Sequence, residues 1–170
     1  VGWGMAGGVW EAMQQKASAK ASIDQNGKLT VCSSNATATT GIYTVMTQIA
    51  AQASGVAVQD VTFVLGDSSL PTAPLQGGSF TVSSVGTAVQ QACAALQEKL
   101  LAVARQTHPA FAAVTSEQAV FEAGQLRYGD SHTSLAELVR SSGEATLEVQ
   151  VDAEPDKKRE AYATATHSAV

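Results

Sequence analysis

The stretch of the sequence with the most groups able to bind a ligand is QGGSFTVSSVGT, residues 76–87. Its paired glycines let the backbone approach a ligand closely, and its hydroxyls can donate hydrogen bonds. The stretch runs into a segment with helical periodicity, whose first N–H groups and positive dipole end would favour an anion such as phosphate. We therefore predict a ligand-binding loop whose candidate residues are Gly77, Gly78, Ser79, Thr81, Ser83, Ser84 and Gly86.

A second helix entry of the same kind is TTGIYT, residues 39–44. Thr40 and Gly41 are its candidate binding residues, and Thr39 or Thr40 is expected to cap the helix. Two such entries in one small domain would suit a ligand with several phosphates or many hydrogen-bond acceptors. The residues by themselves fit two ordinary capped helices equally well.

Two other motifs carry less information. Gly2, Gly4 and Gly7 form a GxGxxG pattern, but only Val1 precedes it, whereas a dinucleotide-binding fingerprint needs a preceding strand and a following helix. The triplet Gly-Asp-Ser at 66–68 could hold a hydrolytic Ser68. A serine nucleophile needs a base and a group that orients the base, and no local pattern ties a histidine to Ser68.

Composition narrows the class of protein. The chain has 170 residues, of which 45% are hydrophobic and 15% charged, so it is long and apolar enough for one folded domain. Its net charge of -5 argues against a nucleic-acid or anionic-membrane partner, and no apolar run is long enough to span a membrane. Cys32 and Cys93 lack metal-site spacing and are expected to be buried thiols.

Periodicity predicts an α+β fold, in which β-hairpins and a mixed sheet pack against two main helices. An Asn-Gly turn at 26–27 predicts a hairpin between 17–24 and the strand that begins at Leu29. Residues 1–12 are expected to form a buried strand. The other expected elements are helices at 42–53, 84–105 and 134–142, strands at 61–65 and 146–151, and a hairpin at 118–128.

Several blocks of the sequence resemble the molybdopterin-binding large subunits of the xanthine dehydrogenase/aldehyde oxidase family, and the bacterial aldehyde-oxidoreductase branch most closely. These blocks are GMAGGVWEA at 4–12, GIYTVMTQIAA at 41–51, VTFVLGDSSLP at 61–71 and the stretch GGSFT…SVGTAV within 77–89. The similarity covers nearly the whole chain and is strongest over 41–96. Each block is weak alone, but their joint order and spacing are specific.

The resemblance implies a piece of the C-terminal molybdenum-cofactor-binding region of a larger subunit, with residues 1–108 clamping the cofactor and 109–170 continuing the domain. It implies a molybdenum–molybdopterin cofactor, in bacteria often the cytosine dinucleotide form, and oxidative hydroxylation of an aldehyde or N-heterocycle. It also implies 2Fe–2S and FAD groups on partner subunits. The loop at 77–86 is similar to the family's clamp on the pterin dinucleotide.

The sequence departs from the family pattern at residues 33–41, which look shortened and lack the first glycine of a Gly-x-Gly approach. The family's catalytic glutamate belongs to a Gly-Glu motif expected beyond Val170, so no catalytic or metal-ligating residue is assigned. A module that kept the fold and lost the cofactor stays open, as does, more remotely, a hydrolase using Ser68. Cytoplasm and periplasm are both open.

Overall fold

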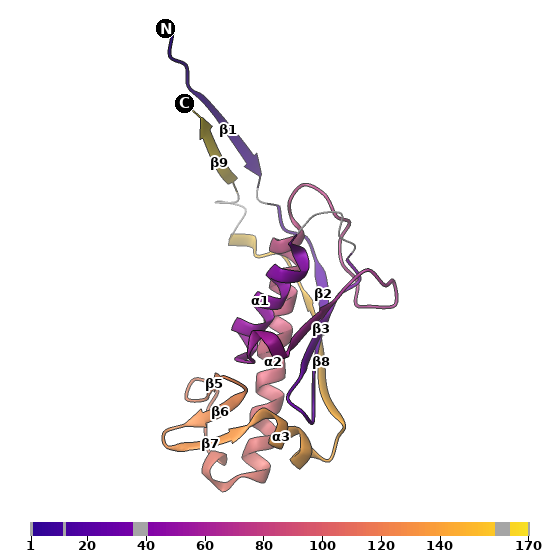
Figure 1. The fold of residues 1–170 in the computed structure, drawn as a ribbon, viewed down its shortest axis with the longest axis vertical. Coiled ribbons are helices and arrows are strands. Elements are labelled where there is room, and N and C mark those ends of the chain that lie inside the picture. The colour runs from indigo at the N-terminus through magenta and orange to yellow at the C-terminus, as the bar shows by residue number, and fades with distance from the viewer. Residues whose placement is uncertain (1, 12, 36–40, 159–163, 170) are drawn as a thin grey trace.

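The computed structural model describes residues 2–11, 13–35, 41–158 and 164–169, and only the backbone of 9–11 and 164–169. The helices are α1 (Ile42–Ser54), α2 (Thr81–Thr107) and α3 (Leu135–Ser142), with short 3-10 turns at Val58–Asp60 and Pro109–Phe111. The strands are β1 (Ala6–Glu11), β2 (Ala17–Asp24), β3 (Leu29–Cys32), β4 (Val61–Val64), β5 (Val120–Glu122), β6 (Gln125–Tyr128), β7 (Ser131–Ser134), β8 (Thr146–Ala153) and β9 (Thr164–Ala169). The α+β fold class is confirmed (Figure 1).

The main sheet has the strand order β4-β3-β2-β8. β2 pairs antiparallel with β3 and with β8, whereas β3 pairs parallel with β4, so the predicted mixed sheet is confirmed. The predicted hairpin joins β2 to β3, and Gly27 in its turn has a φ of 78°, which favours glycine. Because β3 and β4 are parallel, α1 serves as the crossover between them.

The inner face of the sheet carries small side chains where the long helix crosses it. Ala17, Ala19 and Ala21 of β2 are buried against α2, which packs over both β2 and β8. Alanines keep the sheet surface flat, so the helix can lie close to the strands. The face of α2 that meets them is apolar, as its periodicity predicts, and its buried residues include Val85, Ala88, Val89, Ala92, Leu96 and Leu100.

Helices α1 and α2 run side by side in the same direction on this face of the sheet. The start of α1 at Ile42 lines one pocket with the start of α2, and Ile49 lies against Gly86 further along both helices. A Cβ on Gly86 would stand 3.0 Å from Ile49 Cδ1, so glycine at this position allows the close approach. The N-terminal ends of both helices therefore lie at the same end of the molecule.

The helix starts differ from the predictions. α2 begins at Thr81, three residues before the predicted start at Ser84. The N-cap of α1 is Gly41, with a φ of 95° and no side-chain cap, so the predicted capping by Thr39 or Thr40 is wrong. Thr39 and Thr40 themselves lie outside the described residues. A glycine in the left-handed region turns the chain sharply into the helix, which a threonine does not do readily.

Residues 1–12 contain the predicted strand, but the prediction that it is buried is wrong. Among the described residues, β1 pairs only with β9, in antiparallel orientation. Residues 2–8 are exposed, Trp3 to 90%. The two strands form a ribbon that projects beyond the ends of α1 and the main sheet (Figure 1). Apolar composition indicated burial, but within the described chain no second layer covers the exposed part of this ribbon.

A small three-stranded sheet, β5-β6-β7, lies at the opposite end of the molecule, followed by α3 (Figure 1). The predicted hairpin is its β5–β6 pair, whereas β7 was not predicted. Gly124 in the hairpin turn links this sheet to α1, because its N–H donates to Gly55 O at 2.8 Å. Its carbonyl oxygen accepts a hydrogen bond from Leu135 N at 2.9 Å, which links the turn to α3.

Both thiols are buried, as predicted: Cys93 is fully inaccessible, and Cys32 is 5% exposed. Burial raises the pKa of the Cys93 thiol to about 12 and that of Cys32 above its usual value. Since the thiolate is the reactive form, we expect no reaction of either cysteine with a thiol-reactive disulfide at pH 8 in the native protein. Absorbance of the released thiol should appear only after denaturant is added, and rapid labelling of Cys93 before unfolding would contradict the fold.

Candidate functional site

A pocket of about 390 Å³ lies where the two helix entries meet. It is lined by Ile42, Gln76, Gly77, Gly78, Ser79, Thr81 and Val82. The structure thus brings together the two segments that the sequence singled out separately. Ile42, Gln76 and Val82 were not predicted as binding residues. Gln76 and Val82 belong to the stretch 76–87, but Ile42 meets it only through the parallel arrangement of the helices, which sequence spacing does not give.

Within the part of the chain that the structure describes, the helix ends at this pocket lack the usual compensating groups. Neither Gly41 nor Phe80, the two N-cap residues, makes a side-chain cap, and neither helix has an acidic residue in its first turn. In α3, by contrast, Ser134 caps the helix by accepting a hydrogen bond from Glu137 N, and Glu137 is acidic. Because α1 and α2 are parallel, their positive dipole ends add at the pocket, which favours an anion there.

The loop that forms one wall of the pocket has an unusual backbone. Gly78 and Ser79 follow each other in the left-handed region, with φ values of 55° and 58°. This conformation costs a serine about 1–2 kcal/mol, so the surrounding contacts must hold it in place. A Cβ on Gly78 would lie 2.9 Å from Met13 Cε, and Phe80 N donates to Gly77 O at 3.3 Å. The loop is therefore tightly constrained next to the pocket.

The remaining predicted residues lie around this pocket rather than on its walls. Gly41 is the residue before Ile42, and a Cβ built on it would meet nothing within 4 Å. Ser84 is 1% exposed, and its Oγ accepts a hydrogen bond from Gln15 N at 2.9 Å. Ser83 Oγ donates to Met13 O at 2.5 Å and lies 3.0 Å from Phe80 O. Thr40 lies outside the described residues.

Residues 13–15 were not singled out by the sequence, yet they contact the start of α2 directly. Besides the bonds from Ser83 and to Ser84, the side chain of Gln14 donates to Ser83 O and to Thr87 Oγ1, both at 2.9 Å. The hydroxyls of Ser83 and Ser84 therefore hold the 13–15 segment against the helix. No sequence signal reports these contacts, because they join positions about 70 residues apart along the chain.

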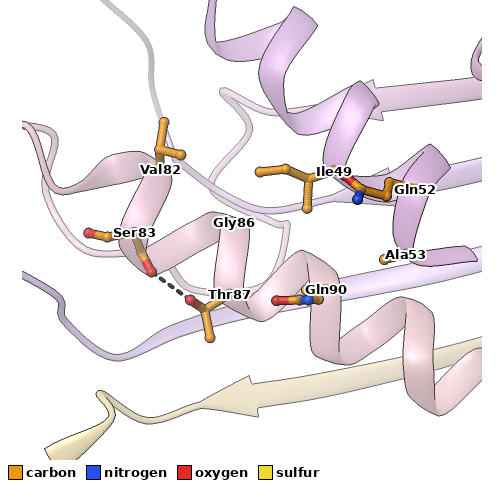
Figure 2. A pocket seen from close by; sticks show the side chains of 8 residues that line it. All are labelled: Ile49, Gln52, Ala53, Val82, Ser83, Gly86, Thr87 and Gln90. Atoms are coloured by element: carbon orange, nitrogen blue, oxygen red, sulfur yellow. Dashed lines mark hydrogen bonds between the residues drawn. The ribbon is translucent and has the colours of Figure 1, made fainter. Parts of the chain in front are cut away.

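A second pocket, of about 480 Å³, lies in the groove between α1 and α2 and shares Val82 with the first (Figure 2). It is lined by Ile49, Gln52, Ala53, Val82, Ser83, Gly86, Thr87 and Gln90. Figure 2 shows Thr87 hydrogen-bonded to Ser83 along the wall of this groove; the bond runs from Thr87 Oγ1 to Ser83 O at 2.7 Å. Of the predicted residues, Ser83 and Gly86 thus belong to this groove.

A third pocket, of about 570 Å³, opens beside β2 and includes Lys16, Lys20 and Asp152. Lys16 is paired with Glu154 at 2.7 Å and Lys20 with Glu148 at 3.5 Å. Because these positive charges are already neutralised by carboxylates, this pocket is a poorer anion site than the one between the helix entries.

The other sequence candidates are not assembled into a site. Asp67 Oδ1 accepts hydrogen bonds from Ser69 N and Ser69 Oγ, both at 2.8 Å, which makes a local turn around Ser68. His108 is hydrogen-bonded to Thr107 at 2.8 Å at the C-terminal end of α2. Among the described residues, no three His, Cys, Asp or Glu side chains cluster as metal ligands, and no helix is long and apolar enough to cross a membrane.

The groups around the first pocket fit the phosphate-bearing part of a pterin cofactor. The two helix starts at this pocket offer backbone N–H donors, and its glycines carry no side chain that would cover the backbone. The hydroxyls of Ser79 and Thr81 can donate as well as accept hydrogen bonds. Acidic side chains are absent from its described lining. The donor set suits an anion and offers no ligands for the metal itself.

Comparison with known proteins identifies the family. The whole chain, residues 1–170, matches the model of the molybdopterin cofactor-binding domain. It is 32% identical over 152 residues to the aldehyde oxidoreductase molybdenum-binding subunit PaoC of Escherichia coli K12, a match that covers 89% of this chain and 20% of PaoC. This chain thus spans about a fifth of the length of that relative.

Solved structures share the fold. Quinoline 2-oxidoreductase from Pseudomonas putida 86 matches with a TM-score of 0.73 at 22% identity, over 89% of this chain and 23% of that one. CO dehydrogenase from Oligotropha carboxidovorans matches with a TM-score of 0.71 at 18% identity, over 89% and 22% of the two chains. These likenesses show a shared fold, and the match of all 170 residues to the family model shows that the chain belongs to the molybdopterin cofactor-binding domain family.

Proposed function

We propose that this chain is the part of a molybdenum hydroxylase large subunit that binds the phosphate-bearing portion of the molybdenum–molybdopterin cofactor, at the pocket between the starts of α1 and α2. One observation carries the proposal: two parallel helices present their N-terminal ends to one pocket, and neither has an acid in its first turn or a side-chain cap from its described N-cap residue. Such an arrangement attracts an anion more strongly than a single helix start does.

Different residues have different roles in this proposal. The pocket wall that contacts the cofactor is formed by Gly77, Gly78, Ser79 and Thr81. Gly41, which follows Thr40, leaves open space beside the start of α1. Ser83 and Ser84 act indirectly, because their hydroxyls hold the 13–15 segment against α2. Gly86 brings the two helices close enough for their ends to share the pocket. Residues 1–108 are the cofactor-clamping part, and 109–170 continue the domain.

The whole protein is proposed to be a molybdenum-dependent oxidoreductase that hydroxylates an aldehyde or an N-heterocycle. When bound, the cofactor supplies the redox-active metal centre, while this chain binds and orients its organic part. The name of PaoC supports the aldehyde class, and that of quinoline 2-oxidoreductase supports the heterocycle class. We further propose the cytosine dinucleotide form of the cofactor, with 2Fe–2S and FAD groups on partner subunits.

The test is a cofactor analysis of the full-length protein purified from a host that makes the pterin cofactor. We expect close to one molybdenum per chain by mass spectrometry, and an equal amount of cytidine monophosphate after acid hydrolysis. Molybdenum without cytidine monophosphate would contradict the dinucleotide form but would still support cofactor binding. Absence of molybdenum, with a known large subunit loaded in parallel as control, would favour a module that has kept the fold and lost the cofactor.

A further inference from the structure

The side-chain amide of Gln14 joins three segments of the chain. Its Nε2 donates to Ser83 O and to Thr87 Oγ1, each at 2.9 Å, in the first two turns of α2. Its Oε1 accepts a hydrogen bond from Asp156 N at 3.2 Å, from the segment that follows β8. Both donor hydrogens and the acceptor oxygen are therefore used, which fixes the orientation of the amide.

The Gln14 contacts are connected to the pocket loop through the neighbouring residue. Ser83 Oγ bonds to Met13 O and lies within hydrogen-bonding distance of Phe80 O, the residue that precedes α2. The Met13 side chain reaches over Gly78, since a Cβ there would come within 2.9 Å of Met13 Cε. Holding the 13–15 segment in place therefore also holds the loop at 78–80.

The loop needs such support because Ser79 has a φ of 58°, a conformation that non-glycine residues adopt only when their surroundings impose it. We propose that Gln14 is a positioning residue for the cofactor: its amide fastens the 13–15 segment to α2 and thereby keeps Gly78 and Ser79 in the conformation that forms the pocket wall. This inference rests on the proposed function, because the pocket must bind the cofactor for the positioning to matter.

The test compares two glutamine substitutions in the full-length holoprotein. Gln14→Met keeps the length of the side chain and removes all three hydrogen bonds. Gln25→Met is the matched control, because Gln25 Nε2 also donates to a distant backbone oxygen, that of Glu144 at 3.0 Å, at the β2–β3 turn far from the pocket. The readout is the rate at which molybdenum and pterin leave the protein after dilution, well below the unfolding temperature.

We expect Gln14→Met to release the cofactor roughly three- to tenfold faster, the size of effect that lost side-chain hydrogen bonds produce. Gln25→Met should release the cofactor at the wild-type rate, even if its melting temperature falls as far as that of Gln14→Met. A purely structural role would instead change the melting temperature without changing the release rate.

A second pair of variants tests the same contact from the helix side. Thr87→Ser keeps the hydroxyl that accepts from Gln14 and should release cofactor at the wild-type rate, whereas Thr87→Val removes it and should speed release. If Gln14→Met does not accumulate as folded protein in the host, the two Thr87 variants test the positioning role in its place. Equal release from Thr87→Val, Thr87→Ser and wild type would overturn the positioning role alone, since the wild type still binds cofactor. A wild type that holds no molybdenum would overturn the proposed function and this inference with it.

Discussion

Replacing Gly55 with alanine should lower the free energy of unfolding by about 3–5 kcal/mol, the combined cost of a left-handed alanine, a steric clash and a disturbed hydrogen bond. Gly55 ends α1 with a φ of 74°, and a Cβ there would lie 2.3 Å from Phe121 O. That atom belongs to the backbone of β5 and cannot move aside alone. The clash would push the β5–β6 hairpin away and disturb the bond from Gly124 N to Gly55 O.

Gly143→Ala is the matched control for this prediction. Gly143 ends α3 with a φ of 77°, nearly the same conformation, but a Cβ there would meet nothing within 4 Å. The control should cost only about 1–2 kcal/mol for the left-handed alanine. Urea denaturation followed by circular dichroism measures both variants. Equal losses of stability in the two would show that the hairpin does not press against the end of α1.

Local patterns were sufficient for the elements that bury one face. The apolar stripe of α2 and the alternation in β2 each gather the core-facing side chains on one side of the element, so periodicity alone predicts which side chains point inward. The Asn-Gly turn likewise fixed the β2–β3 hairpin, because its geometry is set within a few residues. Elements of this kind could be predicted from the sequence almost to their ends.

Elements defined by a distant partner could not be predicted. β7 is a short polar strand that exists because β6 lies beside it, and its residues Ser131–Ser134 carry no strand pattern of their own. The burial predicted for residues 1–12 failed for a similar reason. Apolar composition shows only that a strand could be covered, whereas the described chain pairs β1 with β9 and leaves residues 2–8 exposed.

In the candidate site, too, locally determined features were predictable and features that depend on a distant segment were not. Glycines and hydroxyls at 76–87 indicated a ligand-binding helix entry, and Gly77, Gly78, Ser79 and Thr81 do line a pocket. What the hydroxyls of Ser83 and Ser84 bind depends on the 13–15 segment, which reaches them only after folding. A hydroxyl near a helix start can serve a ligand or another part of the chain, and residue type does not distinguish the two.

Replacing Val82 with aspartate should weaken cofactor retention while leaving the fold as stable or more so. Val82 is 41% exposed, lies in the first turn of α2 and lines both pockets between the helices. An acid in a first turn typically stabilises a helix by about 0.3–1 kcal/mol, because it compensates the dipole. The same charge would repel an anionic cofactor: two like charges roughly 7 Å apart at an effective dielectric constant of ~20 repel by about 2 kcal/mol, or ~30-fold in affinity.

Because the aspartate should stabilise the helix but weaken cofactor retention, substitutions of different charge at Val82 can distinguish the two effects. Val82→Asn has the shape of the aspartate without its charge and should retain cofactor much better than Val82→Asp, while Val82→Lys should bind at least as well as Val82→Asn. Molybdenum per chain after equilibration in cofactor-free buffer reports retention, and the urea midpoint reports stability. Damage to the pocket shape would lower molybdenum retention equally in Val82→Asp and Val82→Asn. An anion bound between the helix ends would instead lower retention in Val82→Asp alone, because only that variant adds a negative charge. Equal molybdenum in the Asp and Asn variants, with both folded, would mean that the phosphates bind elsewhere, since no anion next to α2 could be indifferent to that carboxylate.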